Sequence, residues 1–273
     1  MGERWRPPMF GISAQPSHWD GDVLARLRRR DLTAYWWPHD DTWPDNVGDA
    51  VVFRFGYVTH FDRAQHACFR RWHENGALLL NPPCFWMENK AVMATLALPQ
   101  VRAALAAKDP DLPALLDHTF PETLVLNSRH VDRLMAEQDE WLLKFAGFDD
   151  REQAWGGRSL QVGKMCSREQ WQLALLRALA LPWPVVAQRL VPTAVVDIDY
   201  YDSDGHQKTL HRGNTRLRVF FLRDEAGTVL PCGAHVTVSA QTPAVSEATD
   251  AVQAPVVFGD WLHQPIDGGV HVS

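Results

Sequence analysis

Lysine is rare in this sequence, and two of its lysines stand at positions that need an explanation. The chain has 273 residues and 27 basic side chains, of which five are lysines and 22 are arginines. Lys90 follows a Pro-Pro turn at the expected start of a helix, and Lys144 ends an expected strand before a glycine-containing loop. A compact ammonium on a flexible stem suits a phosphate that moves during a reaction. Lys144, beside this loop, could therefore supply a point charge to a phosphate, whereas Lys90 can be interpreted as a solvated residue at a helix start.

The loop after Lys144 is the second feature that suggests chemistry. It contains a Gly-Gly-Arg-Ser stretch formed by Gly156, Gly157, Arg158 and Ser159. Glycines let backbone N–H groups approach phosphate oxygens. The stretch matches neither the P-loop pattern nor the dinucleotide-binding pattern. A plain hairpin turn is therefore the alternative.

A third cluster of polar residues raises the possibility of a metal. His60, Asp62, His66 and Cys68 lie close together in sequence. No second pair of ligands follows at a standard zinc spacing. We therefore favour a solvated helix face over a zinc site.

Composition excludes several classes of protein. The net charge of −6 and the pI near 6.0 argue against a dedicated nucleic-acid binder. The sequence has no apolar run of about 18 residues and no apolar core of a signal peptide at its start. We therefore expect no membrane span and a cytoplasmic location, where the four cysteines are free thiols.

The first part of the chain alternates between strand and helix patterns. Residues 1–85 contain expected strands and, between them, expected helices, which is typical of an α/β open sheet with mostly parallel strands. The expected strands are Met9–Ala14, Leu32–Trp37, Asp49–Phe55 and Ala77–Asn81, and the expected helices are Asp20–Arg30 and Asp62–Gly76. We expect a first domain over residues 1–85.

The remainder, residues 86–273, has an α+β pattern that we divide at residue 185. In 86–185 the expected helices are Asn89–Leu98, Val101–Lys108, Ser128–Gln138 and Ser167–Leu181, and the expected strands are Phe120–Leu126 and Glu140–Gly147. In 186–273 a strand at Val185–Val191 is followed by antiparallel hairpins with turns at Asp-Ser-Asp-Gly and Asp-Glu-Ala-Gly. The tail after Gln241 is expected to drape over the sheet.

The order of these segments resembles the ATP-grasp superfamily. The resemblance covers roughly residues 9 to 240 and rests on the order of seven stretches: DAVVFR, LLLNPP, NKAVMATL, FPETLVL, LLKFAG, GGRSLQVG and VVAQRLV. It implies an N-terminal α/β domain followed by two α+β subdomains that bind ATP, with Lys90 and Lys144 on the phosphates.

The resemblance also implies roles for residues outside the lysine pair. Gly156, Gly157, Arg158 and Ser159 would close over the phosphates, and the backbone of Gln188, Arg189 and Leu190 would contact adenine. Asp197 would reach the ribose hydroxyls, although a solvated hairpin is the alternative there. Arg216 and Arg218 would stabilise the transferring phosphate or orient a carboxylate.

The last strands depart from the superfamily's usual pattern. Its enzymes hold Mg²⁺ with acidic residues on these strands, and Mg²⁺ prefers hard oxygen ligands. Here the strands read TRLRVFFL and GAHVTVS, which offer Arg216, Arg218 and His235 but no carboxylate. In this they look more like the circularly permuted ATP-grasp proteins. If Mg²⁺ is bound, its candidate ligands are Asp199, Asp224, Glu225 and Glu247.

Two functions follow, with a third left open. The resemblance implies an ATP-dependent ligase that joins a carboxylate, on a small molecule or a peptide-like substrate, to an amine or a thiol through an acyl-phosphate. The missing carboxylates favour a second interpretation, a non-catalytic module that binds nucleotide or a partner after losing its metal site. A small kinase on the same fold stays open, and the sequence assigns no substrate and no oligomeric state.

Overall fold

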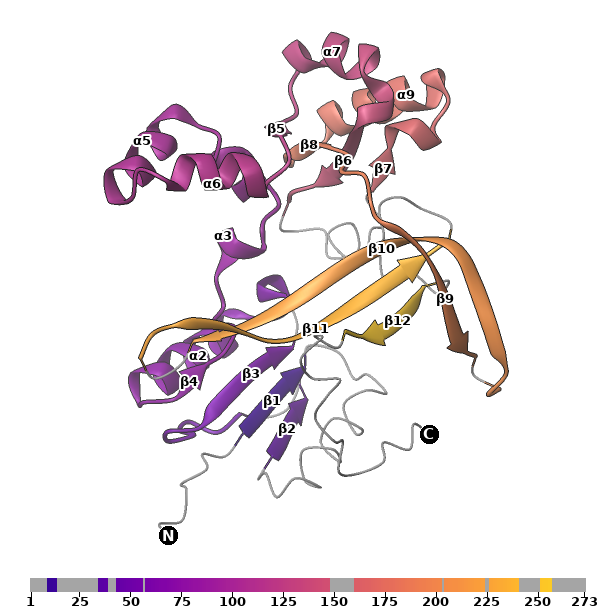
Figure 1. The fold of residues 1–273 in the computed structure, drawn as a ribbon. Coiled ribbons are helices and arrows are strands. Elements are labelled where there is room, and N and C mark those ends of the chain that lie inside the picture. The colour runs from indigo at the N-terminus through magenta and orange to yellow at the C-terminus, as the bar shows by residue number, and fades with distance from the viewer. Residues whose placement is uncertain are drawn as a thin grey trace. The chain divides into compact units, whose positions relative to one another are not determined.

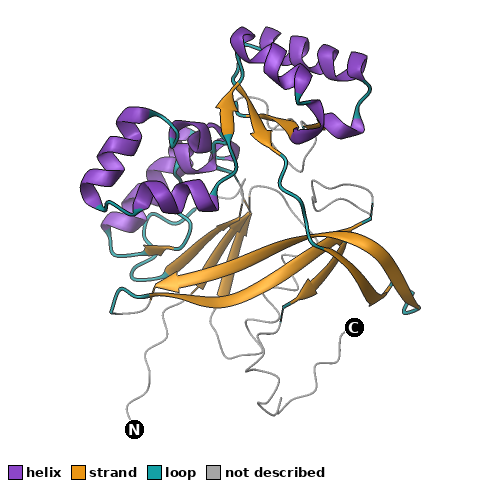
Figure 2. Cartoon of the chain, turned by 45° about the horizontal axis from the view of Figure 1, so that its top comes forward, coloured by secondary structure: helices purple, strands orange, loops and turns teal. Residues whose placement is uncertain are grey.

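The computed structural model describes residues 9–13, 34–38, 43–55, 57–147, 160–202, 204–223, 226–240 and 251–256. The chain forms two compact units. The first comprises Met1–Ser128, Lys144–Ala154 and Leu176–Ala187, and the second comprises Arg129–Leu143, Trp155–Leu175 and Gln188–Ser273. Figure 1 labels the elements, and Figure 2 separates helices from strands.

The first unit begins with a four-stranded sheet. Its strands are β1 (Met9–Ser13), β2 (Ala34–Pro38), β3 (Val51–Phe55) and β4 (Leu78–Leu79), in the order β2-β1-β3-β4. All three pairings are parallel. The helix expected over Asp20–Arg30 lies outside the described residues. An α/β open-sheet domain over 1–85 therefore stays a prediction.

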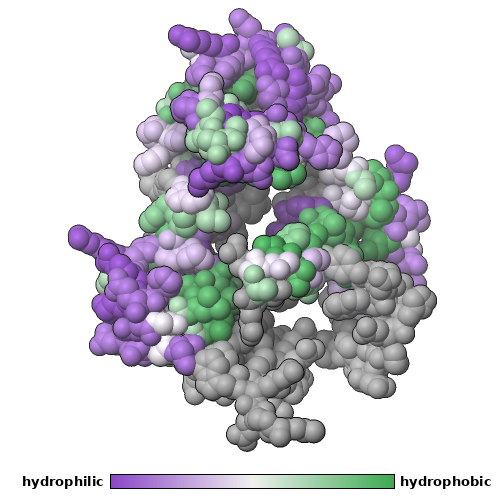
Figure 3. All heavy atoms as spheres, turned by 60° about the vertical axis from the view of Figure 1, so that its left-hand side comes forward, coloured by the Kyte–Doolittle hydropathy of each residue, from purple (hydrophilic) through white to green (hydrophobic). Residues whose placement is uncertain are grey.

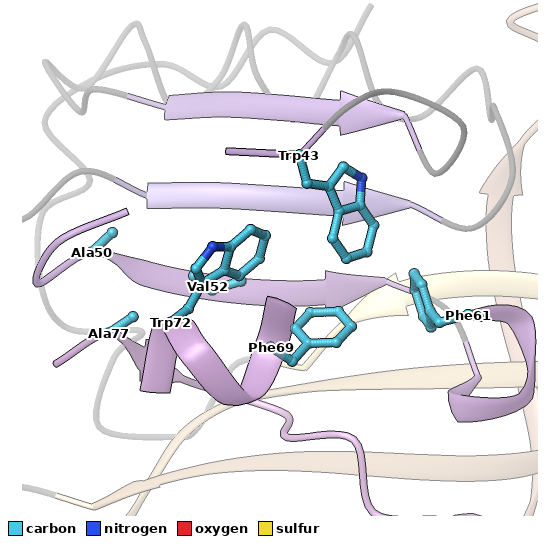
Figure 4. Packing of buried hydrophobic residues seen from close by; sticks show 7 residues of the cluster. All are labelled: Trp43, Ala50, Val52, Phe61, Phe69, Trp72 and Ala77. Atoms are coloured by element: carbon cyan, nitrogen blue, oxygen red, sulfur yellow. The ribbon is translucent and has the colours of Figure 1, made fainter. Parts of the chain in front are cut away.

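Helix α2 (Arg63–Glu74) packs on this sheet through aromatic side chains. It begins with a capping box, in which the Asp62 carboxylate accepts from the Gln65 amide and the Gln65 side chain accepts from the Asp62 amide. Phe69 and Trp72 are buried with Trp43, and the rings of Trp43 and Trp72 stack at 5.5 Å (Figure 4). The tryptophans in this unit thus include core anchors, as large aromatic residues usually do.

Short helices follow in the first unit. They are the 3₁₀ turn η1 (Val58–His60) and the helices α3 (Phe85–Glu88), α4 (Ala91–Thr95), α5 (Pro99–Lys108) and α6 (Leu112–Thr119). The expected helix Asn89–Leu98 is too long, because Asn89 is extended and the helix begins after Lys90. Pro99 was expected to break a helix but begins α5, where its missing N–H costs nothing. Helix α6 was not predicted. No helix in the described ranges has the length and apolar character needed to cross a membrane.

A second sheet has the order β5-β8-β6-β7. Its strands are β5 (Thr123–Val125), β6 (Trp141–Phe145), β7 (Gln161–Val162) and β8 (Val185–Arg189). The helical segments in this part of the chain are η2 (Ser128–His130), α7 (Val131–Ala136), η3 (Gln138–Glu140), η4 (Gly163–Met165) and α9 (Arg168–Ala180). Trp171 of α9 is fully buried and donates to the Leu134 carbonyl at 2.9 Å.

The third sheet is antiparallel and lies in the second unit. Its order is β12-β11-β10-β9, with β9 (Val195–Tyr201), β10 (Gln207–Arg223), β11 (Val229–Ser239) and β12 (Val252–Pro255). The hairpin turn at Asp202 contains Gly205 with φ +80°, as the sequence predicted. Helices with antiparallel sheets confirm the α+β class. Strand β12 was not predicted; the tail after Gln241 was expected only to drape over the sheet.

We expect Gly163→Ala to destabilise the protein by about 1–3 kcal/mol, the usual cost of overpacking. A Cβ at Gly163 would overlap the backbone carbonyl of Gln138, which cannot rotate away as a side chain would. Urea unfolding of the variant measures this cost. Gly233→Ala is the control, because its Cβ would meet only the Phe220 ring at 3.9 Å. Equal stability of the two variants would contradict the prediction.

Candidate functional site

Arg54, at the end of β3, holds the segment that leads to Lys90. Its side chain is only 5% exposed and forms an ion pair with Glu88, while its Nε donates to the Asn81 carbonyl at 3.1 Å. The second Glu88 oxygen accepts from the Val58 amide at 2.7 Å. A buried arginine needs such partners, because an uncompensated charge is costly there. The turn between Asn81 and Glu88 is thereby attached to the first sheet at both ends.

Asn89 attaches the next residue, Lys90, to the end of β6. The Asn89 Oδ1 accepts from the Ala91 amide at 2.8 Å, and its Nδ2 donates to the Ala146 carbonyl at 2.8 Å. Ala94 and Ala146 also pack together in a small buried cluster. Asn89, which directly precedes Lys90, is thus hydrogen-bonded to Ala146, which lies two residues after Lys144.

The two candidate lysines interact in the first unit. Burial lowers the pKa of Lys90 below its ordinary value of 10.5. Burial also lowers the pKa of Lys144, and repulsion by the Lys90 charge lowers it further. Both side chains are half-buried, and the charge of Lys90 acts on Lys144. Such an arrangement favours binding of an anion with several charges, because the anion offsets both the repulsion and the lost hydration.

Strand β8, the predicted adenine-binding strand, lies beside the strand of Lys144. The order of the sheet places β8 next to β6. The Ala146 amide donates to the Pro184 carbonyl at 2.9 Å, and the Leu190 amide donates to the Glu140 carbonyl at 2.8 Å. Leu190 thus uses its N–H inside the protein, and Gln188, two residues earlier, is buried.

Arg189 belongs to a network in the second unit. It pairs with Glu137 at 2.9 Å and with Glu140. The guanidinium groups of Arg189 and Arg133 lie 4.7 and 5.0 Å from the Trp141 ring, and the Trp141 Nε1 donates to Glu137. That hydrogen bond, followed by the two arginine charges, lowers the pKa of Glu137. The Arg189 side chain therefore has a structural role, and a contact with adenine would come from its backbone.

Arg216 and Arg218 share one face of the third sheet with two polar residues of β11. In the antiparallel register Arg216 is opposite Thr237 and Arg218 is opposite His235, and opposite residues point to the same face. Thr237 is fully buried. Within the part of the chain that the structure describes, the Thr237 Oγ1 and the His235 Nε2 have no hydrogen-bond partner. Two buried polar atoms beside two arginines form a second place suited to an anion.

The acid predicted to bind ribose is engaged within its own sheet. Asp197 of β9 accepts from the Arg212 amide at 2.7 Å, and its other oxygen lies 3.3 Å from His211 Nδ1. The Arg212 amide and then His211 lower the pKa of Asp197. Arg212 has φ +53° at a β-bulge in β10, so the carboxylate supports this irregular backbone. Its contact with ribose stays a prediction.

The predicted loop and metal ligands are mostly not described. Gly156, Gly157, Arg158 and Ser159, like Asp224, Glu225 and Glu247, lie outside the described residues. Asp199 accepts from the Thr209 hydroxyl at 2.6 Å. Among the described residues, a group that could hold a cation is Asp202, Asp204 and His206. It surrounds a hairpin turn, and Lys208 already pairs with Asp202 at 2.7 Å, so it is explained by turn structure.

Known structures resemble the chain only distantly. No protein-family model matches it, and no curated protein matches it. Matching solved structures include the ATP-grasp ligase PsnB in complex with minimal precursor, at TM-score 0.47 and 14% identity over 94% of this chain and 79% of that one. The D-cycloserine synthetase DcsG matches at TM-score 0.42 and 15% identity, over 83% of this chain and 90% of that one.

A third match is D-alanyl-alanine synthetase A from Vibrio cholerae, at TM-score 0.39 and 8% identity over 86% of this chain and 85% of that one. These structures are ATP-grasp proteins, the superfamily that the order of the sequence segments resembles. Because the TM-scores are below 0.5, the activities and substrates of these proteins are not carried over to this chain.

The lowered pKa values predict how Lys144 affects stability. Between the lowered pKa and 10.5, the unfolded chain binds more protons at Lys144 than the folded chain does. The free energy of unfolding should therefore rise with pH across that window. Lys144→Met removes the disfavoured charge, so the variant should be more stable than the native protein at about pH 7, and this advantage should shrink as the pH approaches 10.5. Urea unfolding at several pH values measures it.

Lys108→Met provides the control, since Lys108 is exposed at the end of α5. It should have the same stability as the native protein at each pH. A Lys144→Met variant that is less stable than the native protein at about pH 7 would show that the charge is favourable where it stands.

Proposed function

We propose that the chain is an ATP-dependent ligase that joins a carboxylate to an amine or a thiol. The observation that carries the proposal is the interaction of Lys90 and Lys144, which lowers the pKa of Lys144. A polyphosphate is the common cellular ligand that neutralises two adjacent ammonium groups at once. The co-linear sequence segments support ATP as that ligand.

The proposal gives the residues distinct roles. Lys90 and Lys144 bind phosphate oxygens, the stretch of residues 156–159 closes over them, and the backbone of residues 188–190 contacts adenine. Asp197 contacts ribose. Arg216 and Arg218 stabilise the transferring phosphate or orient the substrate carboxylate, for which a planar guanidinium is well suited. His235 and Thr237 join them in this role, because the register places their side chains on the same face.

ATP would supply the phosphoryl group that converts the substrate carboxylate into an acyl-phosphate, from which the amine or thiol displaces phosphate. The protein's contribution is positioning and electrostatic stabilisation, as in phosphoryl transfer generally. The substrate is a small-molecule or peptide-like carboxylate, and the place of action is the cytoplasm. We retain the division into residues 1–85, 86–185 and 186–273 as part of the proposal.

The described residues fit the phosphates better than they fit Mg²⁺. Strands β10 and β11 contain no aspartate or glutamate. Asp199, the described candidate for a Mg²⁺ ligand, already accepts a hydrogen bond from Thr209. This observation favours a second candidate function, a module that binds nucleotide without turnover and neutralises the phosphates with Arg216 and Arg218.

Lys144→Met should weaken ATP binding about tenfold or more, because the loss of a hydrogen bond to a charged group costs roughly 1.5–3 kcal/mol. The dissociation constant from isothermal titration calorimetry measures the effect. Lys108→Met should bind ATP like the native protein. Unchanged ATP affinity in the folded Lys144→Met variant would show that Lys144 does not bind the phosphates.

Titration of ATP with Mg²⁺ and with EDTA separates the two candidate functions. A ligase needs the cation to neutralise the clustered phosphate charge. We therefore expect Mg²⁺ to strengthen ATP binding at least about tenfold and the purified chain to release phosphate when given carboxylate and amine substrates. Equal binding in EDTA without phosphate release would favour the module. Absence of nucleotide binding in both conditions would overturn both candidates.

A further inference from the structure

Helix α2 has a basic face beside its buried face. Phe69 and Trp72 pack into the core, whereas Arg63, His66, Arg70 and His73 recur at intervals of three or four residues. Residues at this spacing lie on one side of a helix. These four side chains line a cavity of about 850 Å³ in the first unit. Its size is within the range of ligand pockets.

The rest of the cavity wall is apolar and partly exposed. It is formed by Leu78 and Leu79 of β4, by Pro82 and Pro83, and by Phe85. Leu78 is 56% exposed and Phe85 is 48% exposed. On the side of the molecule in Figure 3, hydrophobic surface lies directly beside strongly hydrophilic surface. Among the described residues, no acidic one lines the cavity, so the described wall combines apolar surface with positive charge.

The described residues offer the arginines of this face no carboxylate partner, in contrast to Arg71. Among the described residues, none forms an ion pair or a hydrogen bond with the side chain of Arg63 or Arg70. Arg71, on another side of the helix, pairs with Asp45 at 3.1 Å. The His66 ring is fixed, because its Nε2 lies 3.0 Å from the Val58 carbonyl, which can only accept a hydrogen bond.

Strand β4 adds backbone groups to the same cavity. It is at the edge of its sheet, with β3 as its neighbour among the described strands. The amides of Leu78 and Leu80 donate to Ala50 and Val52 of the β3 side. Since alternate residues of a strand bond to the same neighbour, the N–H and C=O of Leu79 face away from β3. Such an edge can receive an extended peptide, and Pro82, which lacks an N–H, limits its length.

We propose that this cavity binds a short acidic peptide segment of a partner protein in extended conformation. The peptide backbone pairs with Leu79, its carboxylates contact Arg63 and Arg70, and an apolar side chain packs on Leu78 and Phe85. This mode combines strand addition with charge complementarity. The proposal does not depend on nucleotide binding, because none of these residues belongs to the proposed ATP site.

The first test is direct binding to the full chain. The probe is a fluorescent peptide of about seven residues in which glutamate alternates with leucine. We expect binding that weakens as salt rises and that falls about tenfold or more in the double variant Arg63→Glu/Arg70→Glu. The control, Lys108→Glu/Arg177→Glu, makes the same change in net charge at exposed positions and should bind like the native protein. Circular dichroism verifies that both double variants are folded.

Two further readouts examine the binding mode. Phe85→Ser, at an exposed position, should weaken the peptide several-fold without altering ATP affinity. Amide exchange at Leu79 should slow in the peptide complex and stay fast with a peptide of the same charge that carries proline at alternate positions. Unchanged Leu79 exchange would overturn strand addition.

Other results would overturn the proposal as a whole. Equal peptide affinity in the native protein and in Arg63→Glu/Arg70→Glu would show that the basic face is not used. Citrate binding as tightly as the peptide would mean a small-anion site. A dimer that dissociates in the double variant, with no peptide binding, would mean that a second copy of the chain occupies the face.

Discussion

The proposed site depends on keeping two ammonium groups close together. The charge of Lys90 repels Lys144, and burial removes part of the hydration of both side chains. The backbone next to the lysines is attached to other elements, because Asn89 donates to the Ala146 carbonyl and Glu88 pairs with Arg54. The lysine pair is thus held by residues that carry no expected role in nucleotide binding.

Lys90 and Lys144 could each be singled out in the sequence because their signals are local, whereas the resemblance joined them as a pair, and their contact with phosphate stays a prediction. A lysine after a Pro-Pro turn and a lysine before a glycine-containing loop can both be recognised within a few residues. The α+β class was predictable for the same reason, since hairpin turns such as the one at Gly205 have their own residue preferences. Element boundaries were less predictable, because Pro99 begins a helix as readily as it ends one.

The remaining features depend on contacts between distant residues. Arg54 and Glu88 are 34 positions apart, and neither residue type predicts a buried ion pair. Thr237 was missed because its position opposite Arg216 follows from the register of β10 and β11, which a sequence pattern does not fix. A search for polar residues on the strand that also carries His235 would have found it.

The partners of the arginine and lysine side chains indicate where ligands are expected to bind. Arginines such as Arg54, Arg102 and Arg189 are satisfied by carboxylates within the protein, for which a rigid guanidinium is well suited. Burial lowers the pKa of Lys90 and of Lys144, and the charge of Lys90 lowers the pKa of Lys144 further. For Arg63 and Arg70 no such pair is found among the described residues, and apolar surface lies beside them. In a chain of net negative charge, positive groups left uncompensated next to a cavity indicate an anion supplied from outside.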